Sequence, residues 1–382
     1  MPLFDVYPLY NVTPVSAKGV HVYDENGTEY LDLYGGHAVI SIGHSHPTYV
    51  EAVSSQVSKL GFYSNAIQNP IQVKLADKLE ALSGCGGYEL FLCNSGAEAN
   101  ENALKLASFK TGQSRVVAFK NGFHGRTSAA VAATDNPNII APINAQQKVT
   151  ILELNNILGV KAELEKGDVC AVIVEFIQGV GGLDQGTKDF FEQVYALCQS
   201  NGTLFIADEV QSGYGRSGKF FAFQHYNVTP DIISIAKGMG NGFPIGGILI
   251  HPDIEAKHGM LGTTFGGNHL ACAAGLAVLE TIEEENLIDN VNKISEYFIE
   301  KAKGFSEIKN VKGRGLMIGL EFDFEVGALR KSLIYDYKIF TGGASNKKLL
   351  RILPPLNIEK THIDTFFEAL EKALREIEIT AN

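Results

Sequence analysis

The chain lacks three features that would each narrow its function at once: a surplus of basic residues, a long apolar run and closely spaced cysteines. Its 382 residues carry 32 Lys and Arg against 43 Asp and Glu, a formal net charge of -11. Nucleic acids and anionic membranes are bound by basic surfaces, so this balance argues against both as partners. It does not exclude small anionic substrates, which respond to the local field and not to the total charge.

No apolar run approaches the roughly 18–20 residues that a membrane-spanning helix requires. The five cysteines are scattered, with no C-x-x-C pair, at Cys85, Cys93, Cys170, Cys198 and Cys272. Three of them fall in apolar strand-like or helical patterns, which favours buried thiols in a reducing compartment. The segment Met1–Asp5 has neither a basic leader nor an apolar signal core. We therefore expect a cytoplasmic protein.

The rest of the composition is ordinary for a globular protein, with 45% hydrophobic and 20% charged residues. Short β-branched and aromatic runs alternate with helical patterns. Strands are predicted at 89–93, 115–119, 149–154, 170–176, 203–207, 232–236 and 247–250, and helices at 71–82, 97–110, 188–200 and 269–283. Such alternation predicts an α/β fold with a mostly parallel sheet covered by helices on both faces. Ligands bind at the carboxyl ends of these strands.

The sequence pattern changes from about residue 284. Acidic helical segments, a probable strand pair at 311–317 and an amphipathic helix at 362–377 predict a smaller α+β domain. We expect the N-terminal segment, residues 1–45, to join this domain. Residues 46–283 would then form the large domain and residues 284–382 the C-terminal small domain.

Lys237 is the most informative residue of the chain. It follows the apolar run 232–236 and opens a loop with glycine at nearly every second position. Glycines let the backbone approach a bound group closely, and partial desolvation disfavours the charged form of a lysine and frees its amine as a nucleophile. This is the setting of a Schiff-base lysine. Taken alone, the stretch is equally compatible with a solvated lysine at a strand-to-loop turn.

Asp208 lies at the carboxyl end of the strongly apolar strand 203–207. Buried aspartates are rare unless they are paired with a cation or with hydrogen-bond donors. A protonated pyridine nitrogen is such a partner, and a pair about 4 Å apart gains roughly 4 kcal/mol at an effective dielectric near 20. A metal ligand is the alternative, but no His or Asp cluster at ligand spacing accompanies Asp208, so no metal is predicted.

Two segments have the features of phosphate-binding turns. Ser95 and Glu98 form a capping box that starts a helix, and the free N–H groups of Gly96 and Ala97 then lie at its positive end. The segment 262–268 offers the hydroxyls of Thr263 and Thr264 before another helix. Each by itself is also explained by a capped helix or a turn without a ligand.

The loop 121–127 places Phe123 between glycines, with Arg126 three residues later. An aromatic ring suits a planar ligand, and the guanidinium fork of arginine binds carboxylates in a bidentate manner. A surface loop with Phe123 in the core is the alternative, and His124 is expected to be structural. Together, the loops supply a lysine, an acid, an aromatic plate, an arginine and two phosphate-binding segments. Pyridoxal 5′-phosphate meets this joint requirement.

With these motifs in place, the chain resembles the class III aminotransferases of pyridoxal-phosphate fold type I, and within them the members that act on N-acyl-ornithines. The resemblance runs from residues 30–32 to residues 350–356. It is carried by SGAEANE at 95–101, FHGRT at 123–127, ADEVQSG at 207–213, AKGMGNGFPIGG at 236–247 and GTTFGGN at 262–268. It implies a seven-stranded sheet and a homodimer with active sites at the subunit interface.

The resemblance also implies the role of each residue. Lys237 would be the Schiff-base lysine and proton shuttle, and Asp208 would pair with the pyridine nitrogen. Cofactor binding is assigned to Gly96, Ala97, Phe123, Asp208, Glu209, Val210, Gln211 and Lys237, and to Thr264 contributed by the second subunit. Arg126 would bind the carboxylate of an N-acyl-ornithine and the distal carboxylate of glutamate. Arg351 would bind the α-carboxylate of glutamate, and Thr263 would contact the substrate.

Two positions depart from the family pattern. Val180 stands where the family usually has a glutamate that neutralises the equivalent of Arg351, and Asn268 is followed by His269 where a proline is usual. Arg351 is therefore expected to be free for another carboxylate. From this we predict that the acyl group carries a carboxylate, as in N-succinylornithine.

The expected reaction moves the terminal amino group of N-acetyl-L-ornithine or N-succinyl-L-ornithine to 2-oxoglutarate, giving the semialdehyde and glutamate, in arginine biosynthesis. Ornithine aminotransferase, 4-aminobutyrate aminotransferase and the aminomutases share the fold and cofactor and remain alternatives. A non-catalytic scaffold would be expected to lose Lys237 or Asp208, and both are present. A nucleotide-binding protein is not supported, because no G-x-x-x-x-G-K-[ST] motif and no dinucleotide fingerprint in a strand–helix context occurs.

Overall fold

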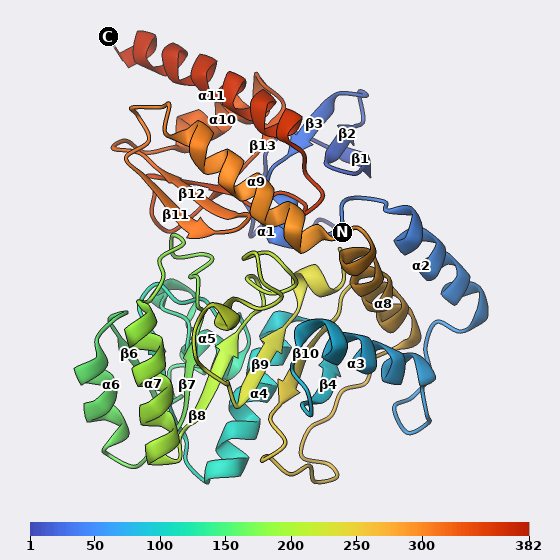
Figure 1. The fold of residues 1–382 in the computed structure, drawn as a ribbon, viewed down its shortest axis with the longest axis vertical. Helices are drawn as coiled ribbons and strands as arrows, with labels where there is room; N and C mark the ends of the chain where they lie inside the picture. The colour runs from blue at the N-terminus through green and yellow to red at the C-terminus, as the bar shows by residue number, and fades with distance from the viewer. Residues whose placement is uncertain (382) are drawn as a thin grey trace.

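A seven-stranded sheet forms the centre of the molecule in the computed structural model, which describes residues 1–381 (Figure 1). The strand order is β4-β10-β9-β8-β7-β5-β6. The strands are β4 (Glu89–Cys93), β5 (Arg115–Phe119), β6 (Val149–Leu152), β7 (Val169–Val174), β8 (Leu204–Asp208), β9 (Ile232–Ile235) and β10 (Gly246–Ile250). β10 pairs antiparallel with both β4 and β9, and the remaining pairs are parallel. The predicted mostly parallel sheet is confirmed.

Helices cover both faces of this sheet, so neighbouring residues of a strand are buried against helices on opposite sides. Phe205 belongs to the same buried cluster as Phe191 of α7, whereas its neighbour Ile206 belongs to the cluster that contains Ala103 of α4. The helices of this part are α2 (Pro47–Lys59), α3 (Pro70–Ser83), α4 (Gly96–Thr111), α5 (Ser128–Ala132), α6 (Ile157–Leu164), α7 (Lys188–Asn201) and α8 (His269–Glu284). Three short 3-10 turns lie at Pro137–Ile139, Ala222–His225 and Lys237–Met239.

Two four-stranded sheets and three helices lie above the carboxyl ends of the central strands (Figure 1). One sheet has the order β1-β2-β3-β13 and the other β11-β12-β15-β14. Their strands are β1 (Pro14–Lys18), β2 (His21–Asp24), β3 (Glu29–Asp32), β11 (Asn310–Arg314), β12 (Met317–Glu321), β13 (Ile339–Phe340), β14 (Gly342–Gly343) and β15 (Leu349–Ile352). The helices are α9 (Leu287–Ala302), α10 (Gly327–Tyr335) and α11 (Lys360–Ala381). Parallel pairing of β3 with β13 ties the N-terminal segment to the C-terminal part, although the domain boundaries themselves stay a prediction.

All seven predicted central strands are present, with ends shifted by at most two residues. The sequence patterns missed α1 (Gly35–Ala38), α2, α5, α6, α10, β1–β3 and β13–β15. α2 has no fully buried residue in the chain as described, and its apolar residues Tyr49, Ala52 and Val53 are half-buried. No helix within residues 1–381 combines the length and the apolar character needed to cross a membrane.

Candidate functional site

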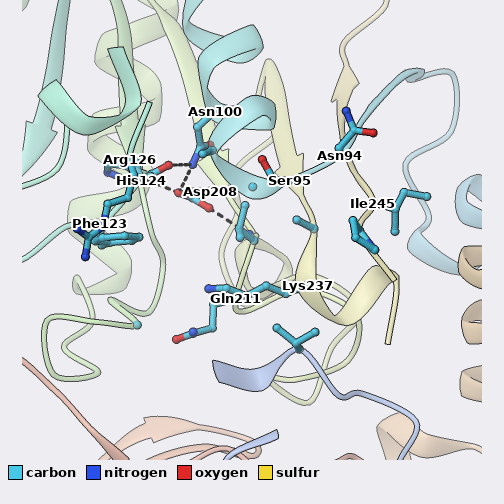
Figure 2. A pocket seen from close by; sticks show the side chains of 18 of the residues that line it. Asn94, Ser95, Asn100, Phe123, His124, Arg126, Asp208, Gln211, Lys237 and Ile245 are labelled. Carbon is cyan, nitrogen blue, oxygen red and sulfur yellow. Dashed lines mark hydrogen bonds and ion pairs between the residues drawn. The ribbon is translucent and has the colours of Figure 1, made fainter. Parts of the chain in front are cut away.

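A cavity of about 340 Å³ opens at the carboxyl ends of β5, β7, β8 and β9, on the side of the central sheet that faces the smaller sheets (Figure 2). Its volume lies in the range of pockets that hold small molecules. Eight of the twelve predicted site residues line it, namely Gly96, Ala97, Phe123, Arg126, Asp208, Val210, Gln211 and Lys237. The chain brings these residues together from four separate loops, as the strand-end rule predicts.

Lys237 begins the 3-10 turn that follows β9, and its half-buried side chain lies in the cavity wall. Desolvation, together with the positive charge of Arg351, lowers the pKa of its amine to about 8, against the opposing charges of Asp208 and Glu175. The backbone of Lys237 is left-handed, with φ of 47°, a conformation that costs a non-glycine residue free energy and persists only where its surroundings impose it. The Ser41 hydroxyl supports this turn by donating to Gly238 O at 2.7 Å.

Asp208, the last residue of β8, is 3% exposed and is the centre of a hydrogen-bond network (Figure 2). Its Oδ2 is 2.7 Å from Nδ1 of His124 and accepts from Nδ2 of Asn100 at 2.7 Å, while its Oδ1 accepts from Val210 N at 3.1 Å. Burial opposes charge on His124, yet the hydrogen bond and the charge of Asp208 hold the pKa of that imidazole above its usual value. The arrangement keeps a carboxylate oriented beside the cavity, where it can pair with a protonated ring nitrogen.

Glu175 is a second buried acid in the wall, directly after β7. Its two carboxylate oxygens accept from Phe123 N and from Gly179 N, both at 2.8 Å. Burial raises its pKa to about 7, against the charge of His124, which lowers it. Glu175 thereby connects the loop that carries Phe123 with the segment that leads to Val180.

Phe123 and Val210 both line the cavity, which agrees with their predicted places on the two faces of a planar ring. Gly96 is required for the position of Val210, because a Cβ at residue 96 would lie 2.5 Å from Val210 Cγ1. Gly96 also opens α4, whose N-cap Ser95 accepts from Glu98 N at 3.2 Å. The first N–H groups of a helix have no intrahelical acceptor, so Gly96 and Ala97 present donors and a positive dipole end to an anion.

These residues fit pyridoxal phosphate, and buried polar atoms without partners support the fit. Gln211 donates through Nε2 to His37 O at 3.1 Å, but its buried Oε1 has no hydrogen-bond partner. Asn100 likewise has an unpaired buried Oδ1. Both residues line the cavity. Gln211 is therefore suited to bind a ring hydroxyl, Asp208 a protonated ring nitrogen, and the start of α4 a phosphate.

Four predicted residues do not line the cavity within this single chain. Glu209 turns away from it, accepting from Ser212 Oγ at 2.6 Å and Phe223 N at 2.8 Å, and burial raises its pKa to about 7. Thr263 Oγ1 accepts from Gly266 N at 3.1 Å, and Thr264 is exposed. Arg351 lies behind Gly179, to whose carbonyl oxygen its Nη1 donates at 2.7 Å.

The aminotransferase class-III family matches the chain over residues 6–374. The chain belongs to the class-III aminotransferases. It is 39% identical to the acetylornithine aminotransferase of Caldanaerobacter subterraneus subsp. tengcongensis, covering 98% of both chains. It is 40% identical to the acetylornithine aminotransferase of Aquifex aeolicus, covering 97% of this chain and 99% of that one.

Solved structures of class-III aminotransferases show the same fold. The ornithine aminotransferase of Toxoplasma gondii ME49 superposes with a TM-score of 0.92 at 27% identity, covering 99% of this chain and 93% of that one. A second structure of the Toxoplasma gondii enzyme, with a TM-score of 0.90 at 26% identity over the same shares, is described as having partial occupancy of pyridoxal phosphate at its active site. The predicted fold type, enzyme class and cofactor are thus confirmed. No group of three or more His, Cys, Asp or Glu within residues 1–381 is arranged to hold a metal ion.

Sequence reasoning gave no functional role to Asn100, His124 and Glu175, which all contact or flank Asp208. The sequence did contain a signal for Asn100 and another for Glu175. Asn100 is a polar residue on the buried face of α4, next to Ala99 and Ala103, and Glu175 ends an apolar strand in the same way as Asp208 does. His124 carries no such signal, because only the fold brings its ring to a residue 84 positions away.

Proposed function

We propose that this aminotransferase acts on an N-acyl-L-ornithine and 2-oxoglutarate, in arginine biosynthesis. The observation that supports an acylated substrate is the set of charged side chains in the cavity wall. Within residues 1–381 its only carboxylates are Asp208 and Glu175, and both are engaged in hydrogen bonds. Free ornithine would bring an α-ammonium group with no acidic partner, which is costly in a buried site. Acylation removes that charge, and the names of the relatives agree with an acylated substrate.

When bound, pyridoxal phosphate supplies a carbonyl group for amines and a conjugated ring that accepts electron density. The amine, the carboxylate and the residues that hold the ring come from the protein chain. Lys237, with a pKa near 8, provides an amine that is partly neutral at physiological pH and can both attack a carbonyl and carry a proton. Asp208, held by His124 and Asn100, would keep a bound ring nitrogen protonated. Phe123 and Val210 line the cavity and would pack against the ring.

Arg126 is proposed to bind the α-carboxylate of the acyl-ornithine and the distal carboxylate of glutamate. Its side chain is exposed at the cavity mouth, and no ion pair engages it among the described residues. Arg351 is proposed to bind the α-carboxylate of glutamate. No acidic residue whose side chain the structure describes, within residues 1–376, forms an ion pair with Arg351, and Val180 stands at the cavity wall beside Gly179. A free cation at this position also favours an acyl group that ends in a carboxylate, as in N-succinylornithine.

A homodimer in the cytoplasm completes the proposal. Thr263 and Thr264 lie outside the cavity of their own chain, and Thr264 is exposed beside Phe265, which is 60% exposed. We infer that a second copy packs here, so that Thr264 of each chain serves the phosphate of the other and Thr263 reaches substrate. All five cysteines are buried free thiols, which suits a reducing compartment.

The test is the absorption spectrum of the purified protein before and after each amino donor is added in a separate cuvette. N-acetylornithine, N-succinylornithine, ornithine and 4-aminobutyrate are compared at equal concentration. A band of the bound cofactor that is converted fastest by one of the acylated donors supports the proposal and identifies the acyl group. Faster conversion by ornithine or 4-aminobutyrate would replace it with one of those activities.

A further inference from the structure

Residues 35–38, labelled α1 (Gly35–Ala38) in Figure 1, form a left-handed helical turn that is separated from β3 by Leu33 and Tyr34. Gly35 and Gly36 have φ of 55°, His37 has 68° and Ala38 has 62°. Backbone bonds from Ala38 N to Tyr34 O at 3.0 Å and from Val39 N to Gly35 O at 2.8 Å close the turn. The left-handed conformation is unfavourable for non-glycine L-residues, and such strain concentrates at functional sites. Because this turn holds both His37 and Ala38 in the left-handed conformation, we expect it to have a functional role.

The turn places the His37 ring against the hydroxyl of Tyr34, and Tyr34 against Arg351. Oη of Tyr34 is 2.5 Å from Nδ1 of His37 and accepts from Nη2 of Arg351 at 3.2 Å. Because this hydroxyl accepts from the guanidinium, its own proton is free to be donated to Nδ1. Burial, together with the charges of Arg351, Lys237 and Arg330, lowers the pKa of His37, which keeps Nδ1 available as an acceptor.

Arg351 is thus held by uncharged acceptors alone. Its Nε donates to Gly343 O at 2.5 Å, its Nη1 to Gly179 O at 2.7 Å and its Nη2 to the Tyr34 hydroxyl. A guanidinium has five N–H donors, so these three bonds leave one N–H on Nη1 and one on Nη2 without a partner among the described residues. Arg351 lies behind Gly179 and is 4% exposed in the single chain, so a carboxylate that reaches it would bind through these two N–H groups. The backbone accommodates the Tyr34 ring through Gly342, where a Cβ would lie 2.2 Å from Cε2 of Tyr34.

We propose that Tyr34, supported by His37 in the left-handed turn, is a positioning residue that orients Arg351 for a dicarboxylate without neutralising its charge. A carboxylate in the place of the Tyr34 hydroxyl would compete with the incoming acid for the guanidinium. A hydroxyl fixes the guanidinium and leaves the full positive charge to the ligand. Tyr34 thereby favours glutamate and 2-oxoglutarate as partners of the reaction. The inference rests on the proposed function in one respect, the assignment of Arg351 as a carboxylate-binding residue.

The first test measures the binding of glutarate, a non-reacting dicarboxylate, to the holoenzyme by calorimetry. Tyr34→Phe keeps the ring against Gly342 and removes the hydroxyl, and it should raise the Kd of glutarate about tenfold, as expected for one hydrogen bond to a charged group. Tyr23→Phe is the matched control, since Tyr23 bonds only to the exposed Glu29 within the described residues. It should leave the Kd unchanged. An unchanged Kd in Tyr34→Phe overturns the proposal.

The second test separates positioning from general damage by following the two half-reactions in single turnovers. Tyr34→Phe should raise the apparent Kd for glutamate and leave that for N-acetylornithine, whose single carboxylate is assigned to Arg126, within twofold. An equal loss of affinity for glutamate and for N-acetylornithine in Tyr34→Phe would overturn the positioning role of Tyr34. His37→Ala should reproduce the defect of Tyr34→Phe, and His37→Asn should largely restore glutamate binding, because asparagine tolerates the left-handed backbone and offers an acceptor oxygen.

Arg351→Lys distinguishes this inference from the proposed function on which it rests. If Arg351→Lys leaves glutarate and glutamate binding unchanged, Arg351 does not bind a carboxylate and that part of the proposed function is wrong. If Arg351→Lys weakens both and Tyr34→Phe weakens neither, the carboxylate site stands and the role of Tyr34 alone is refuted.

Discussion

Lys237 and Asp208 show how single residues acquire their chemistry from contacts that are distant in sequence. Asp208 is oriented by His124 and Asn100, 84 and 108 positions away. Lys237 is held in a left-handed conformation in a turn whose Gly238 carbonyl accepts from Ser41, 197 positions away. Each side chain is rigid because groups from other elements engage it, and this rigidity is what preorganises a site before a ligand arrives.

Replacing Lys237 by alanine should lower turnover by about a thousandfold or more, because no other cavity residue offers a neutral amine. The folded protein should still bind pyridoxal phosphate, now non-covalently, through the start of α4 and Asp208. Absorption spectra before and after dialysis report both effects. Lys166→Ala, at an exposed lysine next to Glu163, is the control and should behave as the unmodified protein. Normal turnover in Lys237→Ala would refute the Schiff-base assignment.

The pH dependence of cofactor attachment follows from the same residue. Burial lowers the pKa of Lys237 from 10.5 to about 8, so the nucleophilic neutral amine accumulates above about pH 8 and not only above pH 10.5. In rapid mixing of cofactor-free protein with pyridoxal phosphate, the rate of covalent attachment should rise with pH and level off above that value. A midpoint near 10.5 would show that Lys237 is solvated.

At the scale of elements, the start of α4 has a structural role and, in the proposed function, a binding role as well. Ser95 caps the helix and lines the cavity, whereas Thr187 caps α7 in the same way, accepting from Phe190 N at 3.1 Å, without lining the cavity. The sequence alone predicted both helices, because capping residues and periodic apolar positions are local signals. The capping pattern by itself does not separate the cap that lines the cavity from the one that does not.

The two caps provide a matched pair of substitutions. Ser95→Ala and Thr187→Ala should each cost about 1 kcal/mol of helix stability, which lowers the thermal midpoint of the cofactor-free protein in both variants. Only Ser95→Ala should also raise the Kd of pyridoxal phosphate, by several-fold, as measured by fluorescence titration. Equal cofactor affinity in the two variants would contradict the placement of the phosphate at α4.

At the scale of the whole molecule, the smaller sheets lie above the carboxyl ends of the central strands, and residues 262–265 lie outside the cavity of their own chain. Exposed aromatic residues gather there. Phe62 is 43% and Phe265 60% exposed, and their rings lie 5.4 Å apart. An aromatic pair exposed beside the two threonines predicted to reach a neighbouring site is the surface that a second copy would cover.

Phe265→Glu should therefore dissociate the proposed dimer and weaken cofactor binding together, since a buried charge without a partner opposes association. Phe109→Glu is the control, because Phe109 is similarly exposed, at 56%, but lies in the last turns of α4, away from the loop. Sedimentation velocity gives the assembly state and fluorescence titration the Kd. A monomeric wild-type protein with full cofactor affinity would exclude the shared site.

The sequence by itself determined the central strands, most of the helices around them and the residue types of the site, because apolar periodicity, capping and glycine placement act over short stretches of chain. The contacts of Tyr34, His37, Asn100, His124 and Glu175 in and around the site were visible only in the tertiary structure. Their hydrogen bonds join segments that are up to 317 positions apart, and no local pattern specifies such a distance. Arg351 was already assigned to a carboxylate by the family resemblance, but the sequence did not show which groups hold its guanidinium. Its set of uncharged acceptors exists only because the left-handed turn, Gly179 and Gly343 meet around one guanidinium.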